Sequence, residues 1–405
     1  MDQKVNKTES YFKTWSSQNQ APTFDIKKVH PFEWELIDGK KIVDMSSTSF
    51  HTSFGLKNTI IENKIIEQLK LQAVSMPKGD TPLRSKVSDK LIERLGIPGK
   101  IFYTTSGAEA IENALKMARQ LSGAPLILSR KKSYHGATLG ALSITGDWRR
   151  EDHHLDPHHA FIPEPIEDPE CHKLEKIINS LGPSSIAAIC LETITGANGV
   201  YIPTQKWYSR IQELSKKYHF YIILDEIICG FKRTGTDFGF QHYQITPDFV
   251  TMAKAISGGM VPFGALYVSS RLAKTYDEKI FSFGLTQYAH PLGLAALDAV
   301  LDLTSSSSFQ KNYEKNVTLF TKILADIKKS PQVKEVRQIG LLAAIEYDFD
   351  FSWQELIDQG IHVCVGSNGL VIAPALNMTQ DKLLEGLQKI LHFSYSRSAY
   401  APQDI

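Results

Sequence analysis

Short apolar runs alternate with amphipathic segments through the middle of the chain. The runs are apolar for most of their length, which is typical of strands buried on both faces of a sheet. They lie at 101–105, 185–192, 220–226, 248–253 and 264–270. Helices are predicted between them, at 108–121 and near 204–218. This alternation predicts an α/β fold with a large, mostly parallel central sheet that helices flank.

The pattern changes near residue 305. The elements predicted beyond it are a helix at 309–329, a strand at 336–347, a short helix beginning at Trp353, a hairpin or strand pair within 363–376 and a helix at 379–394. This order is typical of a smaller α+β domain. The Asp-Gly pair of WELIDGKKIVDM (34–45) predicts a two-stranded hairpin that packs on that domain. We therefore expect an N-terminal segment at 1–50, a large domain at 51–304 and a C-terminal small domain at 305–405.

Composition and charge narrow the class of protein. The chain has 405 residues, 42% of them hydrophobic and 22% charged, and its formal net charge is +1. No run approaches the roughly 20 apolar residues of a membrane span, and the N-terminus lacks the apolar core of a signal peptide. The four cysteines are scattered without CxxC spacing. We expect a cytoplasmic globular protein that binds no nucleic acid, membrane or metal ion.

A first candidate site is TTSGAEA (104–110), where a predicted strand ends in a Ser-Gly turn and a helix begins. Ser106, Gly107 and Ala108 would present free N–H groups at the positive end of that helix, which suits a phosphate. An ordinary helix cap explains the same residues.

Two further segments place charged side chains at strand ends. YIILDEIICGF (221–231) ends its apolar run in Asp225, where a buried carboxylate needs a cationic or N–H partner such as a protonated pyridine. A structural ion pair is the alternative. DFVTMAKAISGG (248–259) places Lys254 directly after an apolar run, where burial favours an imine-forming amine. A lysine that reaches solvent from a strand end is the alternative.

The fourth segment is SYHGATLGALS (133–143), in which Tyr134 and His135 precede a glycine. An aromatic ring at such a turn can stack on a flat heteroaromatic ring, or simply pack in a loop. Taken together, SGAEAIENALKMAR, SYHGAT, LDEIICGFKRTGT, AKAISGG and GLTQYAHPLGLAAL resemble, in order and spacing, the class III (ω-type) aminotransferases of the pyridoxal phosphate (PLP) fold-type I superfamily. The resemblance extends from TWSSQ (14–18) to PAL near residue 374.

The resemblance implies a role for each matching residue. Lys254 forms the Schiff base with PLP and moves the proton, while Asp225 holds the proton of the pyridine nitrogen. Tyr134 stacks on one face of the ring. Ile227, two residues beyond Asp225 and therefore on the same side of a strand, packs on the other face. Ser106, Gly107 and Ala108 are implied to contact the phosphate, and His135 to bind the cofactor. Glu192 is implied to lie near the cofactor oxygen and the substrate pocket. Thr286 is implied to reach the phosphate in the neighbouring subunit of a homodimer with shared active sites.

The chain departs from the family pattern at four positions. Thr193 replaces a common proline after Glu192, Lys232 replaces a glycine, and Ala289 stands where the family has glycine in its Gly-His-Pro. The fourth departure concerns substrate binding: Cys364 aligns with the arginine that grips the substrate carboxylate, and no arginine occurs from 338 to 396. Arg149 and Arg150 are possible substitutes, or both are solvated or paired with neighbouring acids. Trp15, Phe50 and Trp148 are candidates for the substrate pocket, although core packing also explains them.

These features favour a transaminase that moves an amino group from a primary or ω-amine, or an amino acid, to a keto acid in a ping-pong reaction, with pyruvate as the favoured acceptor. Because the arginine is missing, the alternative function is that of an aminomutase, racemase, decarboxylase or lyase of the same family. A non-catalytic dimeric binding module is the remaining alternative, but such a protein has no need of Lys254.

Overall fold

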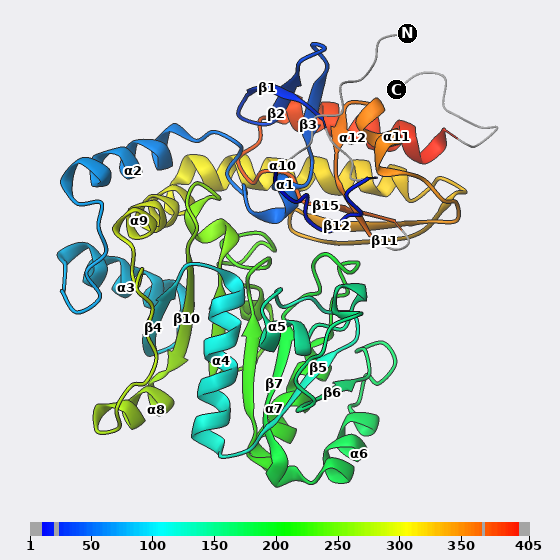
Figure 1. Cartoon of the computed structure of the whole chain (residues 1–405). Coiled ribbons are helices and arrows are strands. Elements are labelled where there is room, and N and C mark those ends of the chain that lie inside the picture. Colours follow the sequence, from blue (N-terminus) through cyan, green and yellow to red (C-terminus); the bar gives the residue numbers. More distant parts are fainter. Residues whose placement is uncertain (1–9, 20–23, 367–368, 397–405) are drawn as a thin grey trace.

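A seven-stranded sheet forms the centre of the larger part of the molecule in the computed structural model, which describes residues 10–19, 24–366 and 369–396 (Figure 1). In spatial order its strands are β4 (Gly99–Thr104), β10 (Gly264–Ser269), β9 (Phe249–Met252), β8 (Tyr221–Asp225), β7 (Ile186–Glu192), β5 (Leu126–Arg130) and β6 (His159–Ile162). Strand β10 runs antiparallel to β4 and β9, and all other neighbouring strands of this sheet pair in parallel. Every residue of β7 is buried, as expected for a strand covered on both faces. The predicted mostly parallel α/β sheet is confirmed.

Helices flank this sheet, and the sequence explains where they begin and end. The helices of this part are α2 (Thr59–Leu71), α3 (Pro82–Leu95), α4 (Gly107–Ser122), α5 (Leu139–Ser143), α6 (His172–Leu181), α7 (Gln205–Tyr218), α8 (Ser270–Ala273) and α9 (Pro291–Ser305). Helix α4 begins after Ser106, whose side chain accepts a hydrogen bond from the N–H of Glu109, and it ends at Gly123 in a left-handed conformation. The sheet and its helices therefore hold the start of α4 in a defined place.

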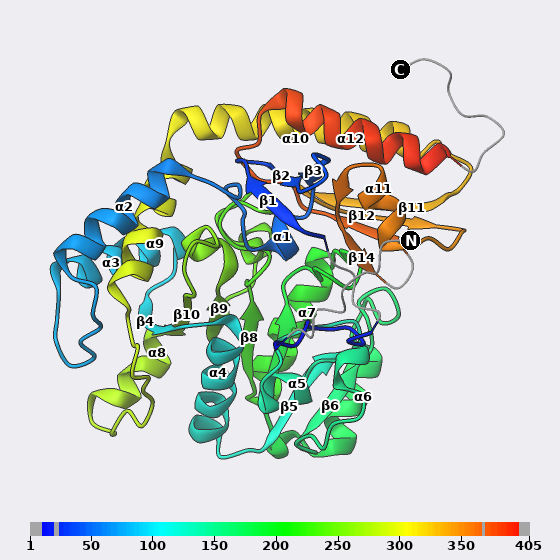
Figure 2. The same cartoon turned by 45° about the horizontal axis from the view of Figure 1, so that its top comes forward.

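A second, antiparallel sheet lies beside the first in the C-terminal part of the chain. Its strands, in spatial order, are β11 (Val333–Ile339), β12 (Leu342–Tyr347), β15 (Gly369–Ile372) and β14 (Cys364–Gly366). Three helices accompany it: α10 (Ser307–Ile327), α11 (Trp353–Asp358) and α12 (Gln380–Tyr395). Figure 2 shows α10 and α12 running side by side along this sheet.

The prediction of one strand at 336–347 is wrong, because this segment belongs to the hairpin of β11 and β12. The sequence offers one turn-forming residue between the two strands, so the segment resembles a single strand. Gly340, at φ +55°, makes the turn, and a Cβ at this position would lie 2.6 Å from the carbonyl oxygen of Arg233. The turn therefore depends on a single glycine.

The N-terminal segment forms a third sheet from β1 (Ile26–Val29), β2 (Glu33–Leu36), β3 (Lys41–Asp44) and the distant β13 (Ile361–His362). The predicted hairpin at 34–45 is confirmed, with Gly39 in its turn at φ +85°. Strand β13 pairs with β3 in parallel, which supports the predicted packing of this segment on the small domain. The domain boundaries at 50 and 304 stay predictions. A short segment, α1 (Ser47–Phe50), follows β3.

Two features of the described part of the chain concern membranes and metal ions. None of its helices combines the length and apolarity that crossing a membrane requires. No group of three or more His, Cys, Asp or Glu side chains in these residues is placed to hold a metal ion.

Candidate active site

The carboxyl ends of three adjacent parallel strands meet at one edge of the large sheet. Glu192 ends β7 and is paired in register with Asp225, which ends β8. Lys254 begins the turn after β9, the next strand in the sheet. Ligands bind at this edge in open α/β sheets. The sheet therefore brings together three residues that are up to 62 positions apart in the sequence.

Asp225 is 3% exposed, and its hydrogen bonds orient it. Its Oδ2 lies 2.8 Å from Nδ1 of His135, and its Oδ1 accepts a hydrogen bond of 3.0 Å from the N–H of Ile227. A buried carboxylate beside Nδ1 requires that this nitrogen carry the proton. His135 is buried too, and its Nε2 has no hydrogen-bond partner among the described residues. The pair forms a polar unit at the strand end that can hold a proton on a bound ring nitrogen.

Ile227 does not lie in a strand, so the argument that placed it on the same strand face as Asp225 is wrong. Strand β8 ends at Asp225, and Ile227 belongs to the turn that follows. The turn nevertheless brings Ile227 to the start of α4: a Cβ on Gly107 would lie 2.6 Å from Cδ1 of Ile227. Only glycine fits at position 107 without a shift of its neighbours.

Lys254 has the environment of a reactive amine. It is partly buried, and its Nζ lies 5.4 Å from the centre of the Phe50 ring. Burial lowers the pKa of Lys254, although the negative charges of Asp225 and Glu192 oppose the shift. Among the residues that the structure describes, no acidic side chain forms an ion pair with Lys254. A lysine with a lowered pKa has a larger uncharged, nucleophilic fraction at neutral pH.

The start of α4 lies against the turn that carries Tyr134. The N–H groups of Gly107 and Ala108 belong to the first turn of the helix, which has no acceptors for them within the helix. A Cβ on Gly136, which has φ +141°, would lie 2.8 Å from Cβ of Ala108. The start of α4 and the Tyr-His-Gly turn are therefore in direct contact. Together they can hold a phosphate beside a flat ring.

Glu192 fixes the position of Tyr134. Its Oε1 accepts a hydrogen bond of 3.0 Å from the N–H of Tyr134, and its Oε2 accepts one of 2.8 Å from the N–H of Gly196. Burial raises the pKa of Glu192. The carboxyl group ties together the loops that follow β5 and β7.

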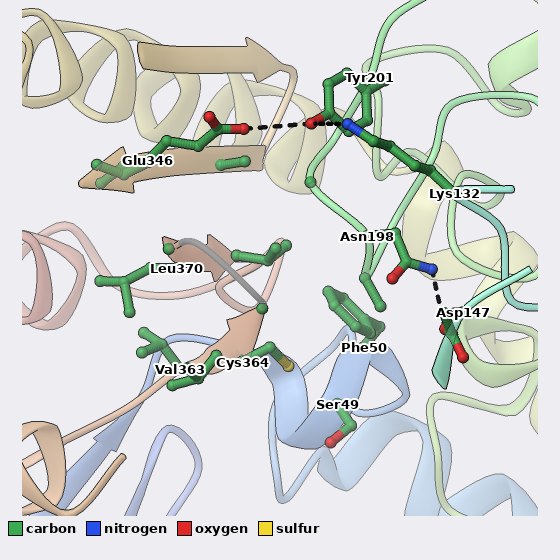
Figure 3. Close-up of a pocket in the computed structure, with 18 of the residues that line it drawn as sticks. Ser49, Phe50, Lys132, Asp147, Asn198, Tyr201, Glu346, Val363, Cys364 and Leu370 are labelled. Carbon is green, nitrogen blue, oxygen red and sulfur yellow. Dashed lines mark hydrogen bonds between the residues drawn. The ribbon is translucent and has the colours of Figure 1, made fainter. Parts of the chain in front are cut away.

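A cavity of about 890 Å³ opens between the large sheet and the small sheet (Figure 3). Trp15, Phe50 and Trp148, the aromatic residues predicted for a substrate pocket, all line it, as does Cys364. Its charged lining consists of Lys131, Lys132, Arg149, Arg337, Asp147 and Glu346. Cations outnumber carboxylates in this set, so the cavity suits an anionic molecule.

The two candidate arginines differ in position. Arg149 lines the cavity, with Cζ 4.5 Å from the centre of the Tyr134 ring and 5.4 Å from that of Trp15, and its Nη1 donates to Asp147 at 2.5 Å. Arg150 contacts His159 at 3.0 Å and does not belong to the cavity lining. Arg149 is therefore the candidate for an acid-binding residue.

Thr286 lies exposed in the segment before α9 and does not line the cavity. Sequence reasoning missed most of the cavity lining, for example Lys132, Asn198 and Tyr201. They lie in the loops after β5 and β7. Their only signal in the sequence is this position after predicted parallel strands.

Comparison with known proteins identifies what the site resembles. The sequence model of the family described as Aminotransferase class-III matches residues 15–393. The taurine–pyruvate aminotransferase of Bilophila wadsworthia is 27% identical over 87% of this chain and 89% of its own length. The mitochondrial gamma-aminobutyrate transaminase 1 of Oryza sativa subsp. indica is 30% identical over 92% of this chain and 81% of its own. Among solved structures, the taurine:2-oxoglutarate aminotransferase of Bifidobacterium kashiwanohense, in complex with PLP and glutamate, superposes with a TM-score of 0.88 at 30% identity and covers 95% of both chains.

Proposed function

Because the chain belongs to the class III aminotransferases, which use PLP, we propose that it moves an amino group from an ω-amino acid or primary amine to pyruvate at the site around Lys254. The observation that carries this proposal is the meeting of Lys254, Asp225 and Tyr134 next to a cavity whose charged lining is mostly cationic. When bound, PLP supplies an aldehyde that condenses with amines and a ring that withdraws electrons from the neighbouring carbon.

The residues of the site fit this cofactor. The first-turn N–H groups of α4 suit its phosphate, and the buried Asp225, braced by His135, suits a protonated ring nitrogen. We assign Tyr134 to one face of the ring and Ile227, which contacts Gly107, to the other. The residues proposed to hold the cofactor are Ser106, Gly107, Ala108, Tyr134, His135, Glu192, Asp225, Ile227, Lys254 and Thr286.

Lys254 is proposed to move the proton of the substrate carbon. Its Nζ accepts the proton in its uncharged form, which the lowered pKa favours at neutral pH. Asp225 would hold the ring nitrogen, while His135, whose Nδ1 lies 2.8 Å from Oδ2, keeps the carboxyl group of Asp225 in place.

Arg149 is proposed to bind the acid group of the substrate. Cys364, which stands where many family members have an arginine, also lines the cavity, and burial raises its pKa to about 12. A neutral thiol gives a carboxylate no ion pair, whereas the guanidinium of Arg149 offers a planar donor set. Its aromatic surroundings restrict it to the side of the cavity where Tyr134 lies.

A homodimer with shared sites is part of this proposal. Helix α2 and the loop after it carry several exposed apolar side chains, namely Ile60, Ile66, Leu69, Leu71, Val74 and Met76. Ser75 Oγ donates to the carbonyl of Tyr288 at 2.5 Å, so this surface adjoins the segment that carries Thr286. An apolar surface of this kind favours a partner subunit. The unpaired state of all four cysteines supports a reducing compartment, and we propose the cytoplasm.

A screen of amino donors against keto acids tests the proposed function. We expect turnover with small ω-amino acids such as taurine or β-alanine, and faster turnover with pyruvate than with 2-oxoglutarate. Absence of turnover, and of any change in cofactor absorption across the amine panel, would contradict the proposal.

Cys364 lines the cavity in place of a carboxylate-binding arginine, which is also compatible with a second reaction type. A reaction without a keto acid does not need to bind the carboxylate of an acceptor. Product analysis without a keto acid separates the two cases. Continuing turnover in its absence would indicate an aminomutase, racemase, decarboxylase or lyase in place of a transaminase.

A further inference from the structure

The four residues of α1 have an unusual backbone. Ser47, Thr48, Ser49 and Phe50 have φ values of +48°, +45°, +61° and +73°, and none of them is glycine. In this left-handed region the Cβ of an L-residue crowds its own backbone, and a β-branched residue such as Thr48 suffers most. Consecutive residues keep this conformation only when their surroundings impose it.

Asp44, the last residue of β3, restrains the turn from one side. Its Oδ1 accepts hydrogen bonds from the N–H and the hydroxyl of Ser46 at 3.0 Å each, and its Oδ2 accepts one from Thr48 Oγ1 at 2.9 Å. The same Ser46 hydroxyl lies 2.7 Å from Nδ1 of His362, which lines the cavity. Burial opposes ionisation, but the hydrogen bonds from His362, Thr48 and Ser46 hold the pKa of Asp44 below its usual value. The carboxylate of Asp44 therefore accepts hydrogen bonds from several donors in the turn.

Arg233 and the segment that follows β15 restrain the turn from the other side. Ser47 Oγ donates to the carbonyl of Ala373 at 2.6 Å and accepts a hydrogen bond of 3.1 Å from Arg233 Nη2. Arg233 is buried, and its Nη1 donates to the carbonyls of Leu341 and Pro374. The turn is thus fixed to both main parts of the molecule.

The restrained turn carries two residues of the cavity wall. Ser49 and Phe50 both line the cavity, and the Phe50 ring lies 5.4 Å from Nζ of Lys254. Figure 3 shows Ser49 and Phe50 beside Cys364. Small shifts of the turn therefore change the space next to the reactive amine.

We propose that Asp44 is a positioning residue for substrate specificity, which holds the left-handed turn Ser47–Phe50 so that Phe50 forms the inner wall of the substrate cavity. The inference rests on the proposed function, because it assigns the cavity to the amine substrate. Asp44 acts through Ser46 and Thr48 in the turn and through His362, whose Nδ1 lies 3.4 Å from its Oδ1. It is not itself one of the residues proposed to hold the cofactor. Its loss releases the turn and opens the inner wall, which weakens the fit of a small donor.

The experiment compares Asp44→Ala with Asp44→Asn, which keeps one acceptor oxygen, and with the double variant Asp44→Ala/Thr48→Gly. Glycine tolerates φ near +45°, so it lets the turn form without its anchor. Asp168→Ala is the matched control, because Asp168 is a buried carboxylate that accepts an N–H bond from Leu174 at the start of α6 and does not line the cavity. The readouts on the holoenzyme are kcat and KM for β-alanine and amide hydrogen exchange of residues 46–52.

We expect Asp44→Ala to speed exchange in residues 46–52 and to raise KM about fivefold or more while kcat stays within about twofold. Asp44→Asn should fall between wild type and Asp44→Ala, and the added Thr48→Gly should recover at least half of the KM change on a logarithmic scale. Asp168→Ala should leave KM and this exchange unchanged. Unchanged exchange in Asp44→Ala, or faster exchange with an unchanged KM, would overturn the inference. Absence of turnover in the wild type would contradict the proposed function instead. The amide hydrogen exchange of residues 46–52 would then still decide whether Asp44 anchors the turn.

Discussion

At the scale of single residues, the surroundings of Lys254 and Arg149 decide their chemistry. Lys254 lies in a partly buried position where charge is disfavoured, and burial lowers its pKa. The guanidinium of Arg149 lies against aromatic rings at the cavity wall. One residue is thus suited to exchange a proton, and the other is suited to bind an anion.

The pKa of Lys254 predicts how the stability of the cofactor-free protein depends on pH. The unfolded chain keeps the lysine proton up to pH 10.5, whereas the folded protein loses it at a lower pH. Within this window the unfolded state binds more protons, so stability rises with pH. Urea unfolding at several pH values should show the free energy of unfolding of the wild type rising relative to that of Lys254→Met below pH 10.5. A constant or falling difference would show that burial does not lower the pKa.

Arg149 and Arg150 predict different kinetic effects. Arg149→Gln should raise KM for β-alanine about tenfold or more, because a charge-assisted hydrogen bond contributes roughly 1.5–3 kcal/mol. Arg150→Gln is the matched control and should change KM less than about twofold, since Arg150 contacts His159 outside the cavity. Equal effects of both substitutions on KM would remove Arg149 from the substrate site.

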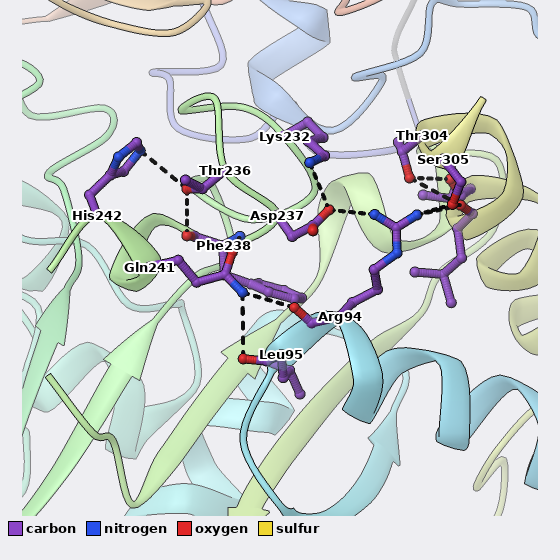
Figure 4. A network of polar contacts seen from close by, with 12 residues as sticks. Arg94, Leu95, Lys232, Thr236, Asp237, Phe238, Gln241, His242, Thr304 and Ser305 are labelled. Carbon is purple, nitrogen blue, oxygen red and sulfur yellow. Dashed lines mark hydrogen bonds and ion pairs between the residues drawn. The ribbon is translucent and has the colours of Figure 1, made fainter. Parts of the chain in front are cut away.

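At the scale of elements, two residues that replace a family glycine adopt a left-handed backbone conformation, which is unfavourable for a residue with a Cβ. Lys232 stands where the family has glycine, and it has φ +77°. Its Nζ lies 3.2 Å from Asp237, which also binds Arg94 at 2.7 Å (Figure 4). The ion pair offsets part of the strain that a side chain causes at this φ. Ala289, at φ +49°, is a second residue in a family glycine position.

Two substitutions at Lys232 separate the backbone strain from the ion pair. Both Lys232→Ala and Lys232→Gly remove the contact with Asp237, but only glycine relieves the left-handed conformation. Lys232→Gly should therefore be more stable than Lys232→Ala by about 1 kcal/mol. Urea unfolding midpoints of the two variants measure this difference, and a less stable glycine variant would contradict the account.

The elements also show how far the sequence alone reaches. Apolar runs with polar ends predicted β7, β8 and β9 and the edge where Glu192, Asp225 and Lys254 meet, because parallel strands share the direction of their carboxyl ends. The hairpin of β11 and β12 was missed, since Gly340 is the one turn-forming residue between the two strands. The choice between Arg149 and Arg150 was also out of reach, because adjacent residues in a short 3-10 turn point in different directions and the local sequence does not say which faces a cavity.

At the scale of the whole molecule, two sheets from different parts of the chain enclose the cavity proposed for the substrate, and a partner subunit is proposed to complete the cofactor site. The cavity is lined from the large sheet side by loops after β5 and β7 and from the small sheet by β12, β14 and β15. Thr286 lies outside this cavity on an exposed segment. An intact site is thus expected to need two copies of the chain.

Subunit mixing tests this expectation. Thr286→Ala should weaken PLP binding about tenfold through loss of a phosphate contact, and Lys254→Ala should be inactive. After exchange of equal amounts of the two variants, about a quarter of all sites should combine an intact Lys254 with an intact Thr286 from the partner. Activity at limiting PLP should therefore reappear in the mixture. No recovery in a mixture shown to contain heterodimers would place Thr286 outside a shared site.

The most direct test of the account is chemical mapping of the cofactor on the wild-type holoenzyme. Borohydride reduction followed by proteolysis and mass spectrometry should find the pyridoxyl group on the peptide that contains Lys254, and Lys254→Ala should carry no such modification. A pyridoxyl group on a different lysine, or complete release of the cofactor from the reduced wild type, would contradict the assignment of Lys254.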